Sequence, residues 1–283
     1  MATRDQRARI AAETVAISTG GLYRAPSGRE VSIAESVRAA IEGGTLVTPG
    51  TANSYQARAA QLAGDRSLQT QFAVTNETTL AAARRLSSTH GPDRTAALNF
   101  ASAKNPGGGF LGGSQAQEES LARASALYVC LSRHMHYYDA NRRCSSSLYT
   151  DHMIISPMVP VFRDDGDELL EEPYEVTFIT SPAPNAKALA SNHPHLLDNL
   201  ESTLRRRMSQ VLSAAVVHGQ TALVLGAWGC GVFGNDPGMV ANLFGEMLLG
   251  SGQFAKAFER VEFAVLDRKG DTYSAFEKVF GGK

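Results

Sequence analysis

Hydrophobic residues in the first 75 positions recur at helical spacing in two stretches, and they alternate with polar residues in shorter segments between them. The pair Gly20-Gly21 separates the first helical stretch from a hairpin-like segment. The predicted elements are a helix over 5–17, a hairpin over 22–33, a helix over 34–42, and strands over 45–49 and 70–75. We expect residues 1–70 to form an accessory layer packed on the rest of the chain.

Beyond residue 75, apolar strands and amphipathic helices alternate regularly. Asn76 and Thr78 offer N-caps for the first of these helices, and Pro237 stands at the first turn of a later one. The predicted strands are 96–101, 153–162, 174–182, 221–228 and 260–267, and the predicted helices are 78–86, 117–133, 197–219, 237–249 and 273–280. This order is typical of an α/β layered fold with a mixed, mostly parallel central sheet flanked by helices. No linker or repeat interrupts it, so we expect residues 1–283 to form a single domain.

Composition and charge then narrow the classes of function. The 283 residues carry 27 Lys and Arg against 28 Asp and Glu, a formal net charge of −1. Proteins that grip bare nucleic acid through many phosphates normally carry a basic surplus, so direct nucleic-acid binding is not expected. The cysteines Cys130, Cys144 and Cys230 form no CxxC pair and no ligand spacing with the seven histidines, which argues against disulfides and a zinc site. No segment has the apolar run of a signal peptide or of a membrane span (about 18 residues), so a cytoplasmic protein without membrane contact is expected.

Glycine is unusual in its placement, because nine of the 26 glycines fall in two short windows. We call residues 107–113 the first glycine loop and residues 226–234 the second glycine loop. Each follows an apolar strand and precedes a helix, and in open α/β sheets the carboxyl edge of the strands is where ligands bind. Glycine lets backbone N–H groups approach an anion, so two facing loops could hold a diphosphate without a lysine cluster. Tight turns and close helix–sheet packing are the alternative explanation of the glycines. The GxGxxG within 229–234 is weak evidence alone, and no P-loop motif is present.

The tripeptide Gln117-Glu118-Glu119 stands directly after the first glycine loop. Acidic residues are common in the first turn of a helix because the helix dipole favours them. Here, however, they follow a loop suited to an anionic ligand. A bound diphosphate favours the protonated form of a nearby carboxyl group, which suits that group to general-acid catalysis.

The stretch LNFASAKNPGGGFLGGSQAQEES places seven residues between Gly-Gly-Gly and Gln-Glu-Glu. It resembles the signature of the poly(ADP-ribose) glycohydrolases, and the bacterial-type members most of all. The segment GAWGCGVFGNDP resembles the diphosphate loop of that family, and VTNETTLAAARRL and FAVLDRKGDTYSAFEKVF resemble its flanking elements. The likeness runs from about residue 70 to the C-terminus and is densest at the two glycine loops.

The resemblance implies a macrodomain-like fold with ADP-ribose across the carboxyl edge of the sheet. It implies hydrolysis of the ribose–ribose O-glycosidic bonds of poly(ADP-ribose), with ADP-ribose as product and ADP-ribosylated proteins as partners. Glu119 would be the catalytic acid, Glu118 a ligand of the neighbouring ribose, and Phe233 would press on the terminal ribose. The implied substrate-binding residues are Asn105, Gly107, Gly108, Gly109, Gln117, Gly229, Gly231, Val232, Phe233, Gly234, Asn235 and Phe276.

Two of these assignments leave alternatives. Asn99 has the spacing of the first asparagine in the wider macrodomain motif, and we prefer Asn105 as the ligand of the distal ribose because it is nearer the loop. Phe263 and Phe276 could each stack on adenine. We favour Phe276, because Phe263 lies in an apolar strand, although Phe276 also fits the apolar face of its helix.

No cofactor or metal is required by this chemistry. Glu119 would protonate the departing ribose 2′-oxygen and then, once ionised, activate water. Glu118 and Glu119 are neighbours that point in different directions from a helix, so two equivalent roles on one bond are not expected. The acidic run Asp164, Asp165, Asp167 and Glu168 is interpreted as a solvated turn.

Three other functions compete with this one. A macrodomain could bind ADP-ribose without cleaving it, but such a protein does not need a carboxylate at the end of the first glycine loop. A hydrolase acting on mono-ADP-ribosylated protein or on a small ADP-ribose derivative would use the same site. An unrelated nucleotide phosphatase is disfavoured, because the sequence has no metal or phosphate-transfer motif.

Overall fold

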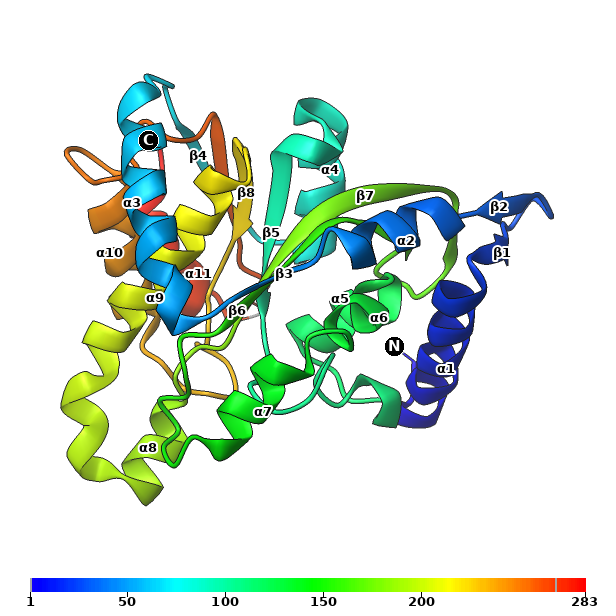
Figure 1. The fold of residues 1–283 in the computed structure, drawn as a ribbon, viewed down its shortest axis with the longest axis horizontal. Helices are drawn as coiled ribbons and strands as arrows, with labels where there is room; N and C mark the ends of the chain where they lie inside the picture. Colours follow the sequence, from blue (N-terminus) through cyan, green and yellow to red (C-terminus); the bar gives the residue numbers. More distant parts are fainter. Residues whose placement is uncertain (1, 268) are drawn as a thin grey trace.

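The fold is organised around a seven-stranded mixed sheet, seen in a computed structural model that describes residues 2–267 and 269–283 (Figure 1). Across the sheet its strands are β3 (Thr45–Val47), β6 (Met153–Arg163), β7 (Leu169–Ser181), β5 (Thr95–Phe100), β8 (Ala222–Leu225), β9 (Arg260–Ala264) and β4 (Gln71–Thr75). The five strands from β7 to β4 run parallel, and β6 and β3 are antiparallel to their neighbours. The predicted mixed, mostly parallel α/β fold is confirmed.

Helices cover both faces of this sheet. They are α1 (Arg4–Gly20), α2 (Ala34–Glu42), α3 (Pro49–Asp65), α4 (Thr79–His90), α5 (Gln117–Ala124), α6 (Leu127–Leu131), α7 (Met135–Arg143), α8 (Ala186–Asn192), α9 (Leu200–Val217), α10 (Pro237–Leu248) and α11 (Asp271–Phe280). Short 3-10 turns lie at η1 (Pro92–Arg94), η2 (Phe110–Gly112) and η3 (Pro194–Asn199), and a small hairpin pairs β1 (Leu22–Arg24) with β2 (Glu30–Ser32). The end of the molecule with α1 and this hairpin lies opposite the end with α9 and α10 (Figure 1).

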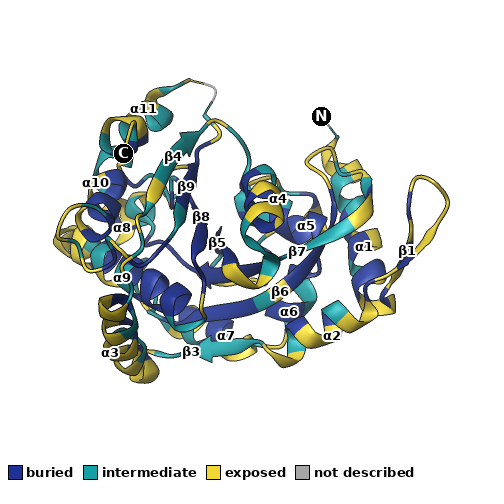
Figure 2. Ribbon diagram, turned by 90° about the horizontal axis from the view of Figure 1, so that it is seen from above, coloured by how far each residue is buried: buried dark blue, intermediate teal, exposed yellow. Residues whose placement is uncertain are grey.

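Side chains along the central strands point alternately to the two faces of the sheet, which explains why helices cover both faces. In β5, Leu98 packs into the core beneath α3, α9, α10 and α11, whereas Ala97 packs into the core on the side of α1, α2 and α4–α7. Leu223 and Val224 divide in the same way on β8. Successive strand residues point to opposite faces, so a strand that is apolar throughout must be covered on both sides. Figure 2 accordingly shows the central strands buried and the outer surface of α3 exposed.

Local signals in the sequence set the ends of several helices. Thr3 and Gln6 form a reciprocal capping box at the start of α1, and Thr78 accepts a hydrogen bond from the Ala81 N–H at the start of α4. Asp236 caps α10 by accepting from the Met239 N–H, with Pro237 at its first position. None of the helices within the described ranges is long and apolar enough to cross a membrane.

The helix expected over 117–133 is two helices, and that prediction is corrected here. Ser125 lies in extended conformation between α5 and α6 and forms an isolated antiparallel bridge with Val161 of β6. The Ala126 N–H donates to the Pro160 carbonyl at 3.1 Å. Pairing with a neighbouring strand therefore interrupts a stretch whose apolar spacing alone fits a continuous helix.

The N-terminal 70 residues contribute to both the helical layer and the sheet itself. α1, the β1–β2 hairpin and α2 pack on one face, but β3 pairs with β6 at the sheet edge. α3 lies against α9, where the Tyr55 hydroxyl is 3.2 Å from Nε2 of His218. The sequence pattern does not predict α3, because its apolar periodicity is weak; its fully buried residues are all alanines.

Candidate active site

The parallel register brings two glycine loops to one edge of the sheet. β5 is bonded to β7 on one side and to β8 on the other, so the segments that follow these three strands emerge side by side. The first glycine loop follows β5, and the second glycine loop follows β8. This is the carboxyl edge, at which ligands bind in open α/β sheets.

The first glycine loop folds tightly around the two adjacent carboxyl groups. Gly107 and Gly108 have φ values of 64° and 60°, in the left-handed region that favours glycine. A Cβ on Gly108 would lie 2.4 Å from Oε1 of Glu119 and 3.2 Å from Oε2 of Glu118. Glycine at this position is therefore required by both the backbone conformation and the space that the carboxylates occupy.

Glu118 points into the protein. Only 3% of its surface is exposed, and its two carboxylate oxygens accept from the Ser102 N–H at 2.6 Å and from the Asn99 amide at 3.2 Å. Burial, with a smaller contribution from the charge of Glu119, raises the pKa of Glu118 to about 8 against the lowering effect of the Ser102 and Asn99 hydrogen bonds. Glu118 is therefore mostly neutral at pH 7.

Glu119 points toward the loop. Its Oε1 accepts a hydrogen bond from the Gly109 N–H at 3.0 Å, and the side chain is partly exposed. The environments of the two carboxyl groups thus differ, as expected for neighbouring residues on a helix. Glu118 is buried beneath the loop, and Glu119 lies on its accessible side.

The two candidate asparagines occupy different positions. Asn99 is fully buried at the end of β5, where its Nδ2 donates to Glu118 and to Thr180, and its Oδ1 has no hydrogen-bond partner in the described part of the chain. Asn105 is exposed, and its backbone carbonyl accepts from the Gly108 N–H. Asn99 supports Glu118 directly, which the preference for Asn105 did not anticipate.

The Gln117 side chain joins α5 to β5 by hydrogen bonds. Its Oε1 accepts from the Phe100 N–H at 2.9 Å, and its Nε2 donates to the Leu98 carbonyl at 2.8 Å and to the Thr79 hydroxyl at 3.1 Å. Both ends of the amide are bonded within the protein. Gln117 thus positions α5 on β5, and its expected substrate contact stays a prediction.

The second glycine loop combines a rigid base with an open tip. At the base, the Asn235 N–H donates to the Gly229 carbonyl and its Nδ2 donates to Pro184, which joins the loop to the segment after β7. A Cβ on Gly229 would meet Asn235 at 2.3 Å. Asn235 is buried, so it holds the loop rather than facing a ligand from solvent.

The tip of the second glycine loop is accessible. Val232 is 77% exposed, and a Cβ on Gly231 would meet nothing within 4 Å. Phe233 is partly buried, with its ring centroid 6.2 Å from that of Tyr149. The N–H groups of Gly231, Val232 and Phe233 donate no hydrogen bond to another group of the described ranges. A Cβ on Gly234 would meet the Lys187 side chain at 2.7 Å.

Phe276 lies in the hydrophobic core, away from any surface that a ligand could reach. It has no exposed area, and its ring centroid is 5.3 Å from that of Phe263, which is equally buried. The apolar periodicity of α11 therefore reflects packing against β9. Stacking of either ring on adenine is inconsistent with this burial, and the prediction is corrected.

Sequence reasoning missed two residues that shape this edge. Tyr149 has a positive φ of 59° and lies beside Phe233. Arg207 of α9 is 1% exposed and donates to the Leu148, Tyr149 and Pro182 carbonyls as well as to Asp151. Its place three residues after Leu204 and four before Val211, on the buried face of α9, was the signal in the sequence.

A glycine-rich loop followed by two unlike carboxyl groups lies at the same sheet edge as a second loop whose tip has backbone donors without a partner in the described ranges. These features define an α/β protein with a hydrolase-type site at the sheet edge. In the described ranges, no three His, Cys, Asp or Glu side chains are arranged to hold a metal ion. Residues 11–164 match the family model described as the microbial-type PARG catalytic domain.

Solved structures are similar over most of the chain. Poly(ADP-ribose) glycohydrolase from Thermomonospora curvata is 48% identical, with 98% of this chain and 100% of that chain covered and a TM-score of 0.88. The structure of that enzyme with the inhibitor ADP-HPD is 49% identical (97% and 99% covered, TM-score 0.87). The Deinococcus radiodurans enzyme in complex with ADP-ribose is 48% identical (89% and 99% covered, TM-score 0.82). None of the curated proteins compared with the chain matches it.

The chain belongs to the microbial-type poly(ADP-ribose) glycohydrolase family, and the family predicted from the two glycine loops is confirmed.

Proposed function

We propose that this protein hydrolyses the ribose–ribose O-glycosidic bonds of poly(ADP-ribose) and releases ADP-ribose, with Glu119 as general acid and base. The observation that carries the proposal is the hydrogen bond from the Gly109 N–H to the Glu119 carboxylate. It holds this carboxylate against the first glycine loop, which also packs on Glu118. Family membership supports the same reaction, because relatives at 48% and 49% identity are named for it and have been solved with ADP-ribose and with the inhibitor ADP-HPD.

Backbone donors are suited to hold the diphosphate. The N–H groups at 231–233, which have no partner in the described ranges, lie at the same sheet edge as the first glycine loop. Neutral N–H donors bind an anion without a surplus of basic side chains. We assign the diphosphate to the sheet edge between Gly107–Gly109 and Gly229–Gly234, with Val232 and Phe233 on its outer side. Asn105 remains a candidate ribose ligand, and ADP-ribosylated proteins are the partners that we propose.

The two carboxyl groups divide the chemistry. Glu119 donates its proton to the departing ribose 2′-oxygen as the glycosidic bond breaks, and the substrate diphosphate stabilises the positive charge that develops at the anomeric carbon. Glu119, now ionised, accepts a proton from the water that attacks this carbon. Glu118, mostly neutral and anchored to Ser102 and Asn99, adds little negative charge beneath the loop and is placed to bind a ribose hydroxyl.

Replacing Glu119 by Gln tests this assignment. Glu119→Gln keeps the shape and can still accept from the Gly109 N–H, but it cannot transfer a proton. We expect kcat for polymer hydrolysis to fall by about 10²–10⁴-fold while ADP-ribose still binds. The measurement is release of ADP-ribose from defined polymer, together with calorimetric binding of ADP-ribose.

Glu35→Gln is a matched control, because Glu35 is an exposed glutamate on α2 far along the chain from the site. Wild-type turnover in Glu119→Gln would contradict the assignment. The same assay with single-unit protein adducts and small ADP-ribose esters identifies the other outcomes. Binding without any cleavage would indicate an ADP-ribose reader, and cleavage of single units alone would indicate a mono-ADP-ribosyl hydrolase.

A further inference from the structure

The acidic run Asp164–Glu168 plays no part in the chemistry above, yet it contacts the helix that carries Glu119. Asp167 lies in the turn between β6 and β7 with a φ of 69°. Its Oδ1 accepts from Nε of Arg123 at 2.8 Å, and the two side chains are only 14% and 3% exposed. The interpretation of this run as a solvated turn is therefore wrong for Asp167, because its carboxylate is paired with a buried arginine.

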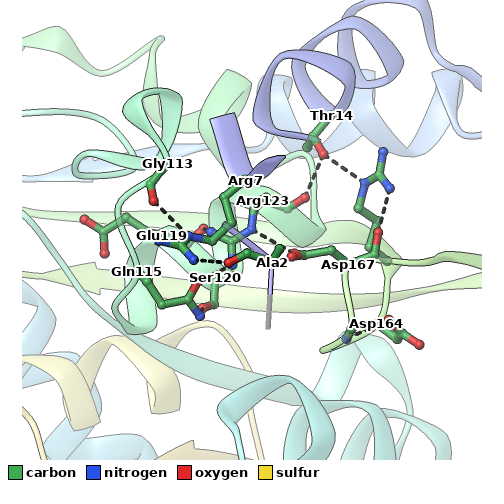
Figure 3. A network of polar contacts seen from close by, with 12 residues as sticks. Ala2, Arg7, Thr14, Gly113, Gln115, Glu119, Ser120, Arg123, Asp164 and Asp167 are labelled. Carbon is green, nitrogen blue, oxygen red and sulfur yellow. Dashed lines mark hydrogen bonds and ion pairs between the residues drawn. The ribbon is translucent and has the colours of Figure 1, made fainter. Parts of the chain in front are cut away.

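Arg123 stands one helical turn after Glu119 and binds the segment that leads to it. Its Nη2 donates to the Gln115 side chain at 3.0 Å, and its Nη1 lies 3.4 Å from the carbonyls of Ser114 and Glu119 (Figure 3). A guanidinium group is planar and rigid, so these contacts fix both ends of residues 114–119 relative to one another. That segment joins the first glycine loop to Glu119.

Asp167 and Arg123 are themselves held by α1. The Thr14 hydroxyl donates to the Arg123 carbonyl at 2.7 Å and accepts from Nε of Arg163 at 3.1 Å. Arg163 also donates to the Asp167 carbonyl at 2.8 Å. A buried ion pair often adds little net stability compared with apolar packing, so its value here is the geometry that it imposes.

We propose that Arg123, oriented by Asp167, is a positioning residue that holds the 114–119 segment so that the Glu119 carboxylate stays at the Gly109 N–H. The inference rests on the proposed function, because the step it serves is proton transfer by Glu119. Arg123 does not touch the reacting atoms; it acts through the backbone of Ser114 and Glu119 and through Gln115.

The test uses Arg123→Lys, Asp167→Asn and the double variant in the full chain. Lys keeps the positive charge beside Asp167 but lacks the two guanidinium nitrogens that bind the 114–119 segment. We therefore expect kcat for polymer hydrolysis to fall by about 10–100-fold. The Kd for ADP-ribose should stay within about threefold, since the hydrogen bonds of the Arg123 side chain go neither to Gly107–Gly109 nor to the second glycine loop. Asp167→Asn should lose less activity than Arg123→Lys, and the double variant should be no slower than Arg123→Lys, because both changes disrupt the same contact.

Arg66→Lys is the matched control, because Arg66 also holds backbone carbonyls, those of Gln220 and Ala257, but at the opposite ends of the strands. It should lower the Tm without lowering kcat. If wild type releases ADP-ribose and Arg123→Lys or Asp167→Asn loses only Tm, the positioning role is overturned while the proposed function stands. If wild type releases none, the proposed function is overturned and this inference with it.

Discussion

At the scale of single residues, the buried carboxyl group of Glu118 makes the stability of the folded protein depend on pH. Its pKa is raised to about 8 in the folded protein, so the folded state holds a proton that the unfolded chain releases near 4.5. The stability associated with this proton is fully present below about pH 4.5 and is lost as the pH rises toward 8. The loss is at most about 5 kcal/mol, at 1.36 kcal/mol per pKa unit.

Glu118→Gln should remove this pH dependence. Gln is neutral at every pH, and a rotated Asn99 amide could accept from it through the Oδ1 that now lacks a partner. We therefore expect the stability of the variant relative to wild type to increase between pH 5 and pH 8. Thermal unfolding of both proteins across this range measures the effect, and a difference that stays constant with pH would contradict the raised pKa.

Gly108 combines a left-handed backbone conformation with close contact to the Glu119 carboxylate. Gly108→Ala places a methyl group where the Glu119 carboxylate now lies, 2.4 Å from Oε1, and so displaces that carboxylate from the Gly109 N–H. We expect kcat to fall by about 10²-fold or more, with a conformational cost of about 1–2 kcal/mol in stability.

The control for Gly108→Ala is Gly250→Ala. Gly250 has a φ of 58°, almost the same as the 60° of Gly108, but a Cβ there would meet nothing within 4 Å. It should lose similar stability and no activity. Equal loss of kcat in both variants would show that backbone strain, rather than displacement of Glu119, causes the effect.

At the scale of elements, α1 braces the first glycine loop. Arg4 and Arg7 donate to the Gly112 and Gly113 carbonyls at 2.9 and 2.8 Å, and Ala11 packs fully buried against Phe110 of that loop. Ala11→Leu overfills this contact, which typically costs about 1–3 kcal/mol, and it should push Phe110 and the loop away from Glu119. We expect at least a tenfold loss of kcat in steady-state polymer hydrolysis together with a lower Tm.

The neighbouring variant Ala12→Leu makes the same chemical change on the exposed side of α1. It should leave both kcat and Tm near the wild-type values. If both variants behaved alike, α1 would have no specific role in holding the loop.

The elements also show where prediction from sequence succeeds and where it ends. The bounds of α2 and the start of α10 followed from local periodicity and Pro237, because these signals lie close to the helix ends that they set. The break at Ser125 and the bracing by α1 depend on contacts between residues far apart in sequence, such as Thr14 with Arg123. Phe276 fits both a core residue and an adenine platform, because apolar periodicity does not distinguish the two.

At the scale of the whole molecule, the near-neutral charge predicts how substrate binding responds to salt. Binding through many lysines and arginines weakens steeply with salt, by about 10³–10⁵ between 50 and 200 mM for six to ten phosphate contacts on DNA. Here the net charge is −1 and the donors that we assign to the diphosphate are backbone N–H groups at 231–233. Such donors displace few counterions from the polymer.

The Kd for ADP-ribose and the KM for polymer should therefore change by less than about tenfold between 50 and 200 mM salt, since few ionic contacts are released. Lys187 is a cation whose side chain lies beside Gly234 of this loop, so Lys187→Met reports its share of the salt dependence. If Kd depends weakly on salt in the wild type and still more weakly in Lys187→Met, one ionic contact is added to binding by the backbone. A steep slope that Lys187→Met leaves unchanged would mean that other basic side chains, and not the glycine loops, hold the polymer.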